Sequence, residues 1–161
     1  MKSAQGLLKR GFTLIELLVV IGILAVLLAI VLIAINPARQ FAQANDTQRR
    51  SDVNAILNAI DQAMVDLSGT LPAPLDTAPQ GTAIPFSSTD VISGTDTGTV
   101  LCQAIVPTYM AQIPKDPQTG SWNDCTNFDT GYTITVATGT GTPRVTVAAT
   151  PQLATSISVT R

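Results

Sequence analysis

The chain of 161 residues contains no histidine. This absence excludes catalytic triads with a histidine base and metal sites built on imidazole. The sequence also lacks a glycine-rich phosphate loop and the Gly-x-Ser-x-Gly turn of many hydrolases. After residue 11 it holds one lysine, Lys115, and one glutamate, Glu16. We therefore expect no enzyme and no cofactor; a membrane-anchored enzyme is the alternative, and its usual residues are missing.

Charged and aromatic residues are also scarce, at 12% and 4% of the chain, whereas 45% is hydrophobic. Soluble domains usually carry about 25% charged residues. Part of the shortfall is local, because residues 12–35 form an apolar run that only Thr13, Glu16 and Gly22 interrupt. As a helix this run would rise roughly 36 Å, enough to cross a hydrocarbon core of about 30 Å. The sequence predicts one membrane span.

Basic residues precede the span: Lys2, Lys9 and Arg10. Such residues keep their end of a span in the cytoplasm, so we expect the rest of the chain outside it. A cleaved secretory signal is the alternative. Its apolar core would have about 7–15 residues followed by a small-x-small site, whereas this run is longer and ends in Ile35-Asn36-Pro37.

Acidic side chains dominate the rest of the chain. After residue 11 there are six basic and eleven acidic residues, a balance of minus five. This balance argues against a basic surface for nucleic acid, so we expect no direct nucleic-acid binding. A binding module that captures DNA or a surface stays an alternative, since Arg144 and Arg161 could form a local patch.

A second helical pattern follows the span. Asn36-Pro37 should kink the helix, because proline removes a donor and crowds the preceding turn. Apolar residues then recur at three- and four-residue steps, and Ser68-Gly69 should end the helix with a left-handed cap. We expect one long helix over about residues 12–67, with polar residues, Asp52 among them, on its other faces. The apolar series is Val53, Ile56, Leu57, Ile60, Met64 and Leu67.

The remaining sequence predicts a small sheet. Residues 69–99 are rich in turn formers and predict an irregular loop with weak strands at most. Residues 100–110 predict a helical turn or a strand, 113–117 a rigid turn, and 139–143 a turn. Three antiparallel strands are expected in the last third, packed on the amphipathic half of the helix. Their alternating residues are Tyr132, Ile134 and Val136, then Val145 and Val147, then Ile157 and Val159.

The most informative stretch is KRGFTLIE at residues 9–16, continued by LLVVIGIL. It resembles the prepilin peptidase signature of type IV pilins and type II secretion pseudopilins. The resemblance implies an α+β fold, in which a long N-terminal transmembrane and amphipathic helix packs on a small C-terminal antiparallel sheet. It further implies four segments: a leader (1–11), a transmembrane and polymerisation helix (12–35), its amphipathic continuation (36–68) and a globular head (69–161).

The same resemblance assigns roles to three residues. Gly11 would precede the bond cut by a membrane aspartic peptidase, Phe12 would become the new, methylated N-terminus, and Glu16 would act in filament assembly. The implied partners are the prepilin peptidase/methyltransferase, other pilin subunits, the inner-membrane assembly platform and the lipid bilayer. The implied location is a single-pass inner membrane protein with its head outside the cytoplasm, and later an extracellular or periplasmic filament.

Physical chemistry supports a special role for Glu16. A carboxylate at the centre of a span costs about 2.5–3.5 kcal/mol, and less near its end. The helix N-terminus favours a negative charge there by about 0.3–1 kcal/mol, and the amine exposed at Phe12 could pair with it, within one subunit or between neighbours. The alternative is that Glu16 only snorkels to the headgroups.

Two further features concern the head. Cys102 and Cys125 are expected to form a disulfide in an oxidising compartment, worth about 3 kcal/mol, with two buried thiols as the alternative. No metal site is expected, although Asp116, Asp124 and Asp129, with Asn127, offer oxygen ligands of the kind that calcium prefers. The segment at 114–117, Pro-Lys-Asp-Pro, resembles one found in pseudopilins and in some pilins.

These observations predict a structural subunit of a type IV pilus-like filament. A pseudopilin of a type II secretion or DNA-uptake system is the alternative, because both kinds of protein share the N-terminal signature.

Overall fold

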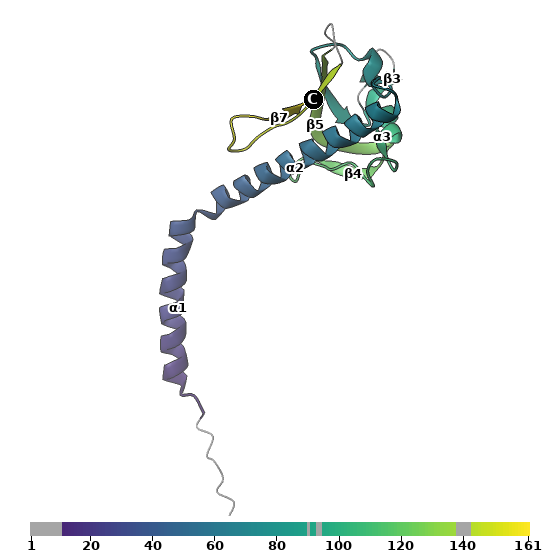
Figure 1. Cartoon of the computed structure of the whole chain (residues 1–161). Coiled ribbons are helices and arrows are strands. Elements are labelled where there is room, and N and C mark those ends of the chain that lie inside the picture. Colours follow the sequence, from purple (N-terminus) through teal and green to yellow (C-terminus); the bar gives the residue numbers. More distant parts are fainter. Residues whose placement is uncertain (1–10, 90, 93–94, 138–142) are drawn as a thin grey trace, which may run out of the picture. The chain divides into compact units, whose positions relative to one another are not determined.

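The computed structural model describes residues 11–89, 91–92, 95–137 and 143–161. The chain divides into two compact units, residues 1–40 and 41–161. The first unit contains α1 (Leu14–Ile35), and α2 (Pro37–Asp66) begins at its end and supplies the long helix of the second unit (Figure 1). Of the expected leader, only Gly11 lies within the described residues.

The helical region consists of two helices rather than the single one expected. Asn36 separates them with φ 46° and ψ 76°, a left-handed conformation that asparagine tolerates better than most residues. Pro37 then opens α2, where its missing N–H donor costs nothing and its fixed φ suits a helix. The irregularity expected at Asn36-Pro37 is therefore present, but it ends one helix and starts the next instead of kinking a single helix.

The predicted apolar face of α2 forms one side of the core. Four members of the series are fully buried, Met64 is partly buried, and Leu67 is 45% exposed beyond the end of the helix. The predicted left-handed end is present at Ser68 and Gly69, which have φ 58° and +89°, and the Gly69 N–H donates to the Met64 carbonyl at 2.8 Å. The buried four are Val53, Ile56, Leu57 and Ile60.

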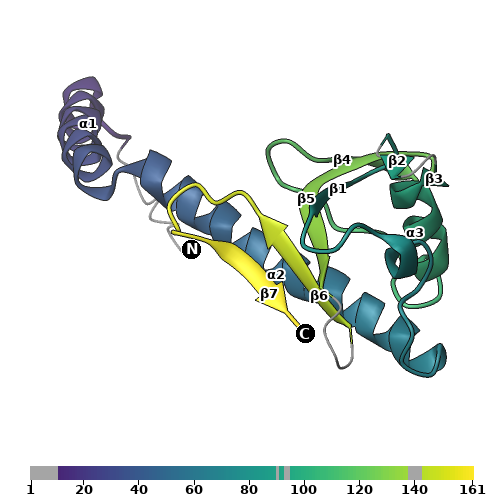
Figure 2. The same cartoon turned by 90° about the horizontal axis from the view of Figure 1, so that it is seen from above.

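An antiparallel sheet packs against α2. Its central strand is β5 (Asn127–Ala137), and the order is β1 (Ala83–Ser87), β5, β6 (Arg144–Ala149), β7 (Ile157–Thr160), with β4 (Ser121–Asp124) also paired to β5. Figure 2 shows β6 and β7 running alongside α2. The three strands expected in the last third are confirmed. β1 lies in the stretch expected to be irregular, because Pro85 interrupts its apolar alternation.

The register of the sheet explains the core. Ile134 of β5 pairs with Ile84 of β1 on one side and with Val147 of β6 on the other, and Val147 pairs with Val159 of β7. Residues directly opposite one another share a face of a sheet. This apolar row therefore crosses four strands and faces the apolar side of α2.

Smaller elements complete this unit. They are η1 (Leu75–Thr77), β2 (Val91–Ile92), β3 (Thr95–Asp96) and α3 (Thr97–Ile105). Two of them, η1 and α3, contribute Leu75, Leu101, Cys102 and Ile105 to the core. The helix α3 resolves the alternatives open for residues 100–110 in favour of helix as far as Ile105. It approaches β1 closely, since a Cβ on Gly98 would lie 1.7 Å from the Ser87 carbonyl oxygen. The turn expected over 139–143 falls, apart from position 143, outside the described residues.

Candidate processing and assembly site

A capping box opens α1 and holds Glu16 in place. The backbone N–H and the hydroxyl of Thr13 donate to Glu16 Oε2 at 3.2 and 3.1 Å, and the Glu16 N–H donates to Thr13 Oγ1 at 3.3 Å. This reciprocal pattern satisfies donors that the first turn of a helix leaves without partners. The Glu16 carboxylate is thereby directed toward the N-terminal end of α1.

Sequence reasoning assigned no role to Thr13. The signal was present, because Thr-x-x-Glu before an apolar run is the capping-box pattern. The expected pairing of Glu16 with the Phe12 amine requires a free amine, and in the uncut chain that nitrogen belongs to a peptide bond. Thr13 supplies the hydrogen bonds to Glu16 in this form of the chain.

Gly11 and Phe12 lie immediately before this cap. Phe12 is 87% exposed, and it borders one hollow together with Glu16, Leu17 and Val20. Among the described residues, a Cβ built on Gly11 would meet nothing within 4 Å. No described contact therefore requires glycine at position 11.

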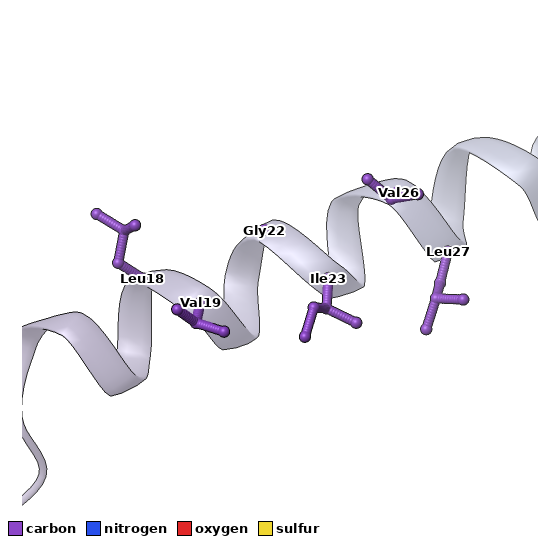
Figure 3. Close-up of a pocket in the computed structure, with 6 residues that line it drawn as sticks. All are labelled: Leu18, Val19, Gly22, Ile23, Val26 and Leu27. Carbon is purple, nitrogen blue, oxygen red and sulfur yellow. The ribbon is translucent and has the colours of Figure 1, made fainter.

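The rest of α1 presents an apolar surface on all sides. None of its residues is buried, and by length and composition the helix is able to cross a membrane. Figure 3 shows a hollow where Gly22, which has no side chain, lies between Leu18 and Val26 along one side of the helix. Val19, Ile23 and Leu27 form the neighbouring row at the same spacing.

The two cysteines of the head are joined. Cys102 in α3 and Cys125 in the turn between β4 and β5 form a disulfide with a Cα–Cα distance of 5.5 Å. This confirms the bridge expected from the sequence. The loop that it closes contains the segment expected to form a rigid turn, residues 113–117, and Ile113 at its start is fully buried.

The three aspartates considered for calcium have protein partners. Asp116 accepts hydrogen bonds from Arg49 and from the backbone N–H groups of residues 118 and 119. Asp124 accepts from the Thr126 N–H and hydroxyl, and Asp129 accepts from the Gly131 N–H. Among the residues that the structure describes, no three acidic or thiol groups come together in a way that could hold a metal ion.

The sequence did not predict a buried ionic cluster between α2 and the segment at 114–117. Arg49 on α2 lies between Asp46, at 3.0 Å, and Asp116, and all three side chains are buried. Burial opposes ionisation of Asp116, but the hydrogen bonds from Arg49 and the backbone outweigh it and lower its pKa to about 2. Sequence periodicity could not reveal this cluster, because Asp116 is distant in sequence.

Asp46 also binds the loop between β6 and β7. Its carboxylate accepts from the backbone N–H groups of Gln152, Leu153 and Ala154 at 2.8–2.9 Å. Burial opposes its ionisation, yet these bonds and the one from Arg49 hold the pKa of Asp46 well below its usual range. One buried carboxylate thus attaches a loop more than 100 residues away to α2.

Asp52 corrects a sequence expectation. It was placed on a polar face of the helix, but it is buried and accepts a hydrogen bond from the Tyr132 hydroxyl at 2.8 Å. Gln48 donates to its other oxygen at 2.8 Å. Burial, followed by the bond to Asp52, raises the pKa of Tyr132. The Tyr132 hydroxyl reaches the buried side of α2, and its hydrogen bond satisfies the Asp52 carboxylate there.

Comparison with protein families matches residues 8–32 to the prokaryotic N-terminal methylation motif. Comparison with curated proteins and with solved structures gave no significant match. The match covers the capped start of α1 and most of its apolar surface. The structure adds an α+β fold in which a helix packs on a small antiparallel sheet. The chain therefore carries, at residues 8–32, the prokaryotic N-terminal methylation motif of the type IV pilin and prepilin type, on an α+β fold that is pilin-like.

Proposed function

We propose that this chain is a structural subunit of a type IV pilus-like filament. In this proposal a prepilin peptidase cuts between Gly11 and Phe12, the new amine of Phe12 is methylated, and α1 anchors the subunit in the membrane until it polymerises. The head, residues 69–161, stands outside the cytoplasm on residues 36–68. The segment boundaries follow the sequence-based expectation.

One observation carries the proposal. A glycine whose added Cβ would meet no described atom stands directly before an apolar helix whose only charged residue is held at its first turn. We take the reason for a small residue at position 11 to lie in a partner of the chain. A peptidase whose active site accepts only a very small side chain supplies such a requirement.

Cleavage would change the surroundings of Glu16. In the uncut chain the Thr13 N–H and hydroxyl bind its carboxylate. After cleavage a cationic amine lies four residues before Glu16, and methylation leaves it charged. In a bundle of apolar helices each carboxylate needs such a cation, from its own chain or from a neighbour, since an unpaired charge there is costly. This pairing would set the axial register of the subunits.

Two measurements test the proposal. Intact-mass analysis of the chain expressed with an active prepilin peptidase should show the loss of residues 1–11 and one added methyl group on Phe12. Glu16→Gln, which is nearly isosteric, should still be cut but should give far fewer filaments in sheared fractions. An intact Met1 end, or a cut after residue 35, contradicts the first expectation, and normal filaments from Glu16→Gln contradict the second.

A pseudopilin of a type II secretion or DNA-uptake system is the second candidate. The observation in its favour is the segment at 114–117, whose Asp116 is buried against α2. Abundance of the subunit in surface filaments favours the pilus, and confinement to the periplasm favours the pseudopilus.

A further inference from the structure

Two large apolar side chains are exposed near the start of α2, and we call Phe41 and Leu153 the base patch. Phe41 is 71% exposed and Leu153 is 52% exposed. Phe41 lies one helical turn before Asn45, whose side-chain amide donates to Gln152 at 3.1 Å, and Leu153 follows Gln152. Residues one turn apart share a side of a helix. The base patch therefore lies on both sides of the Asn45–Gln152 contact.

The structure holds Leu153 in this position. The Leu153 N–H and its two neighbours donate to the buried carboxylate of Asp46. The backbone of Leu153 is therefore fixed while its side chain is about half exposed.

The surroundings of the base patch carry no exposed acid nearby in the sequence. The sequence has no charged residue from 40 to 45 or from 145 to 160, and Asp46 is buried and paired with Arg49. Arg39, two residues before Phe41, is exposed and basic. A head of net negative charge repels other copies through most of its surface. This partly apolar area adds no negative charge, so a second copy can approach it without that cost.

Chain geometry limits what can cover the base patch in a filament. Phe41 is six residues beyond Ile35, so its backbone lies at most about 20 Å from the end of α1 in any arrangement. Helices in a bundle pack about 8–10 Å apart, whereas a unit with the length of residues 41–161 has a radius of gyration of roughly 14 Å. Units so wide cannot lie side by side at one level, so the copies must be staggered along the bundle. The start of α2 in one copy then comes within reach of the α1 helix of a neighbour.

We infer that the base patch docks onto the apolar surface of α1 from a second copy. The inference rests on the proposed filament and names a further part of its interface, one that belongs to the head. It assigns Phe41 and Leu153 to an intersubunit contact that is formed only after assembly.

Site-specific photocrosslinking tests this contact. p-Benzoylphenylalanine replaces Phe41, Leu153 or Val65, one position at a time, in the full chain expressed with its processing and assembly machinery. Val65 is the matched control, because it is 77% exposed on the same helix but lies roughly 36 Å further along it. We expect covalent dimers from positions 41 and 153, with the crosslinked peptides mapping to residues 14–35 of the neighbour, and none mapping there from position 65.

A second variant measures the consequence. Leu153→Ser should keep the folding stability and the N-terminal processing of the parent chain, yet lower the filament yield several-fold, whereas Val65→Ser should leave the yield unchanged. Normal filaments from Leu153→Ser would overturn the inference. So would crosslinks from positions 41 and 153 that reach only lipid, the assembly platform or another head. Neither result would contradict the proposed filament. Absence of filaments from the processed parent chain removes the proposed function, and the inference with it.

Discussion

The guanidinium of Arg49 donates to both carboxylate oxygens of Asp116, through Nε to Oδ2 and through Nη2 to Oδ1 at 3.1 Å. This two-pronged pair joins α2 to the turn that follows Ile113. Arg49 also binds Asp46, which in turn attaches the loop between β6 and β7. One buried cation therefore holds two loops of the head against the helix.

Replacing this cation should destabilise the head strongly. Arg49→Leu leaves two buried carboxylates without their cation, and removing one partner of a buried pair typically costs about 3–5 kcal/mol. Chemical denaturation of the full chain in detergent micelles, followed by Trp122 fluorescence, measures the loss. Arg50→Leu is the control, because Arg50 is exposed on the same helix and should change the stability by less than about 0.5 kcal/mol. Equal effects of the two substitutions contradict the prediction.

The same cluster predicts loss of stability in acid. The pKa of Asp116 is lowered to about 2 in the folded head, compared with about 3.9 for an unperturbed aspartate. A lowered pKa stabilises the fold fully above about pH 4, and the contribution disappears as the pH falls through about 2. The pKa of Asp46 is also lowered in the folded chain, so Asp46 likewise loses its stabilising contribution in acid. Unfolding followed between pH 5 and 2 should show this slope; it should be shallower in Asp116→Asn and unchanged in the exposed control Asp76→Asn.

The disulfide should contribute measurably to the stability of the head. Cys102 and Cys125 are 23 positions apart, and a bridge over such a loop is worth about 3 kcal/mol. Thermal unfolding of Cys102→Ala/Cys125→Ala should show this loss. Reductant should lower the melting temperature of the parent chain and leave that of the variant unchanged. A parent chain that melts alike with and without reductant would refute the estimate.

The close approach of α3 to β1 predicts that even a methyl group is costly at position 98. A Cβ on Gly98 would overlap the Ser87 carbonyl, which belongs to the backbone and has little freedom to move. Gly98→Ala should therefore destabilise the head by about 1–3 kcal/mol, even though alanine favours helices. Gln103→Ala on the exposed side of α3 serves as the control and should be nearly neutral. Thermal unfolding of both variants decides the point.

Substitutions at position 11 distinguish a requirement of the peptidase from a requirement of the fold. Because a Cβ there meets nothing, Gly11→Val should fold and insert like the parent chain, yet remain uncut when an active prepilin peptidase is present. Gly11→Ala, with a much smaller side chain, should still be cut at a reduced rate. Intact-mass analysis of membrane fractions gives the cut fraction. Full cleavage of Gly11→Val would show that glycine is not what the processing enzyme selects.

Local sequence predicted most of the helices and the later strands. The break at Asn36-Pro37 and the cap at Gly69 depend on the conformational limits of single residues, so they could be located without the fold. β1 could not be located in this way, because Pro85 and the short length of the strand hide its alternation. Only its pairing with β5 makes it a strand. The helix α3 was ambiguous for a related reason, since short apolar runs suit helix and strand equally.

By itself the sequence determined the N-terminal part of this protein: a glycine at position 11, an acid at position 16, and an apolar helix long enough to span a membrane. These properties depend on neighbours within a few residues. Only the tertiary structure decided that Asp46, Arg49 and Asp52 are buried and that Leu153 is held exposed beside α2. Their burial depends on partners such as Asp116 and Tyr132, 67 and 80 positions away, and helical periodicity carries no information about contacts over such separations.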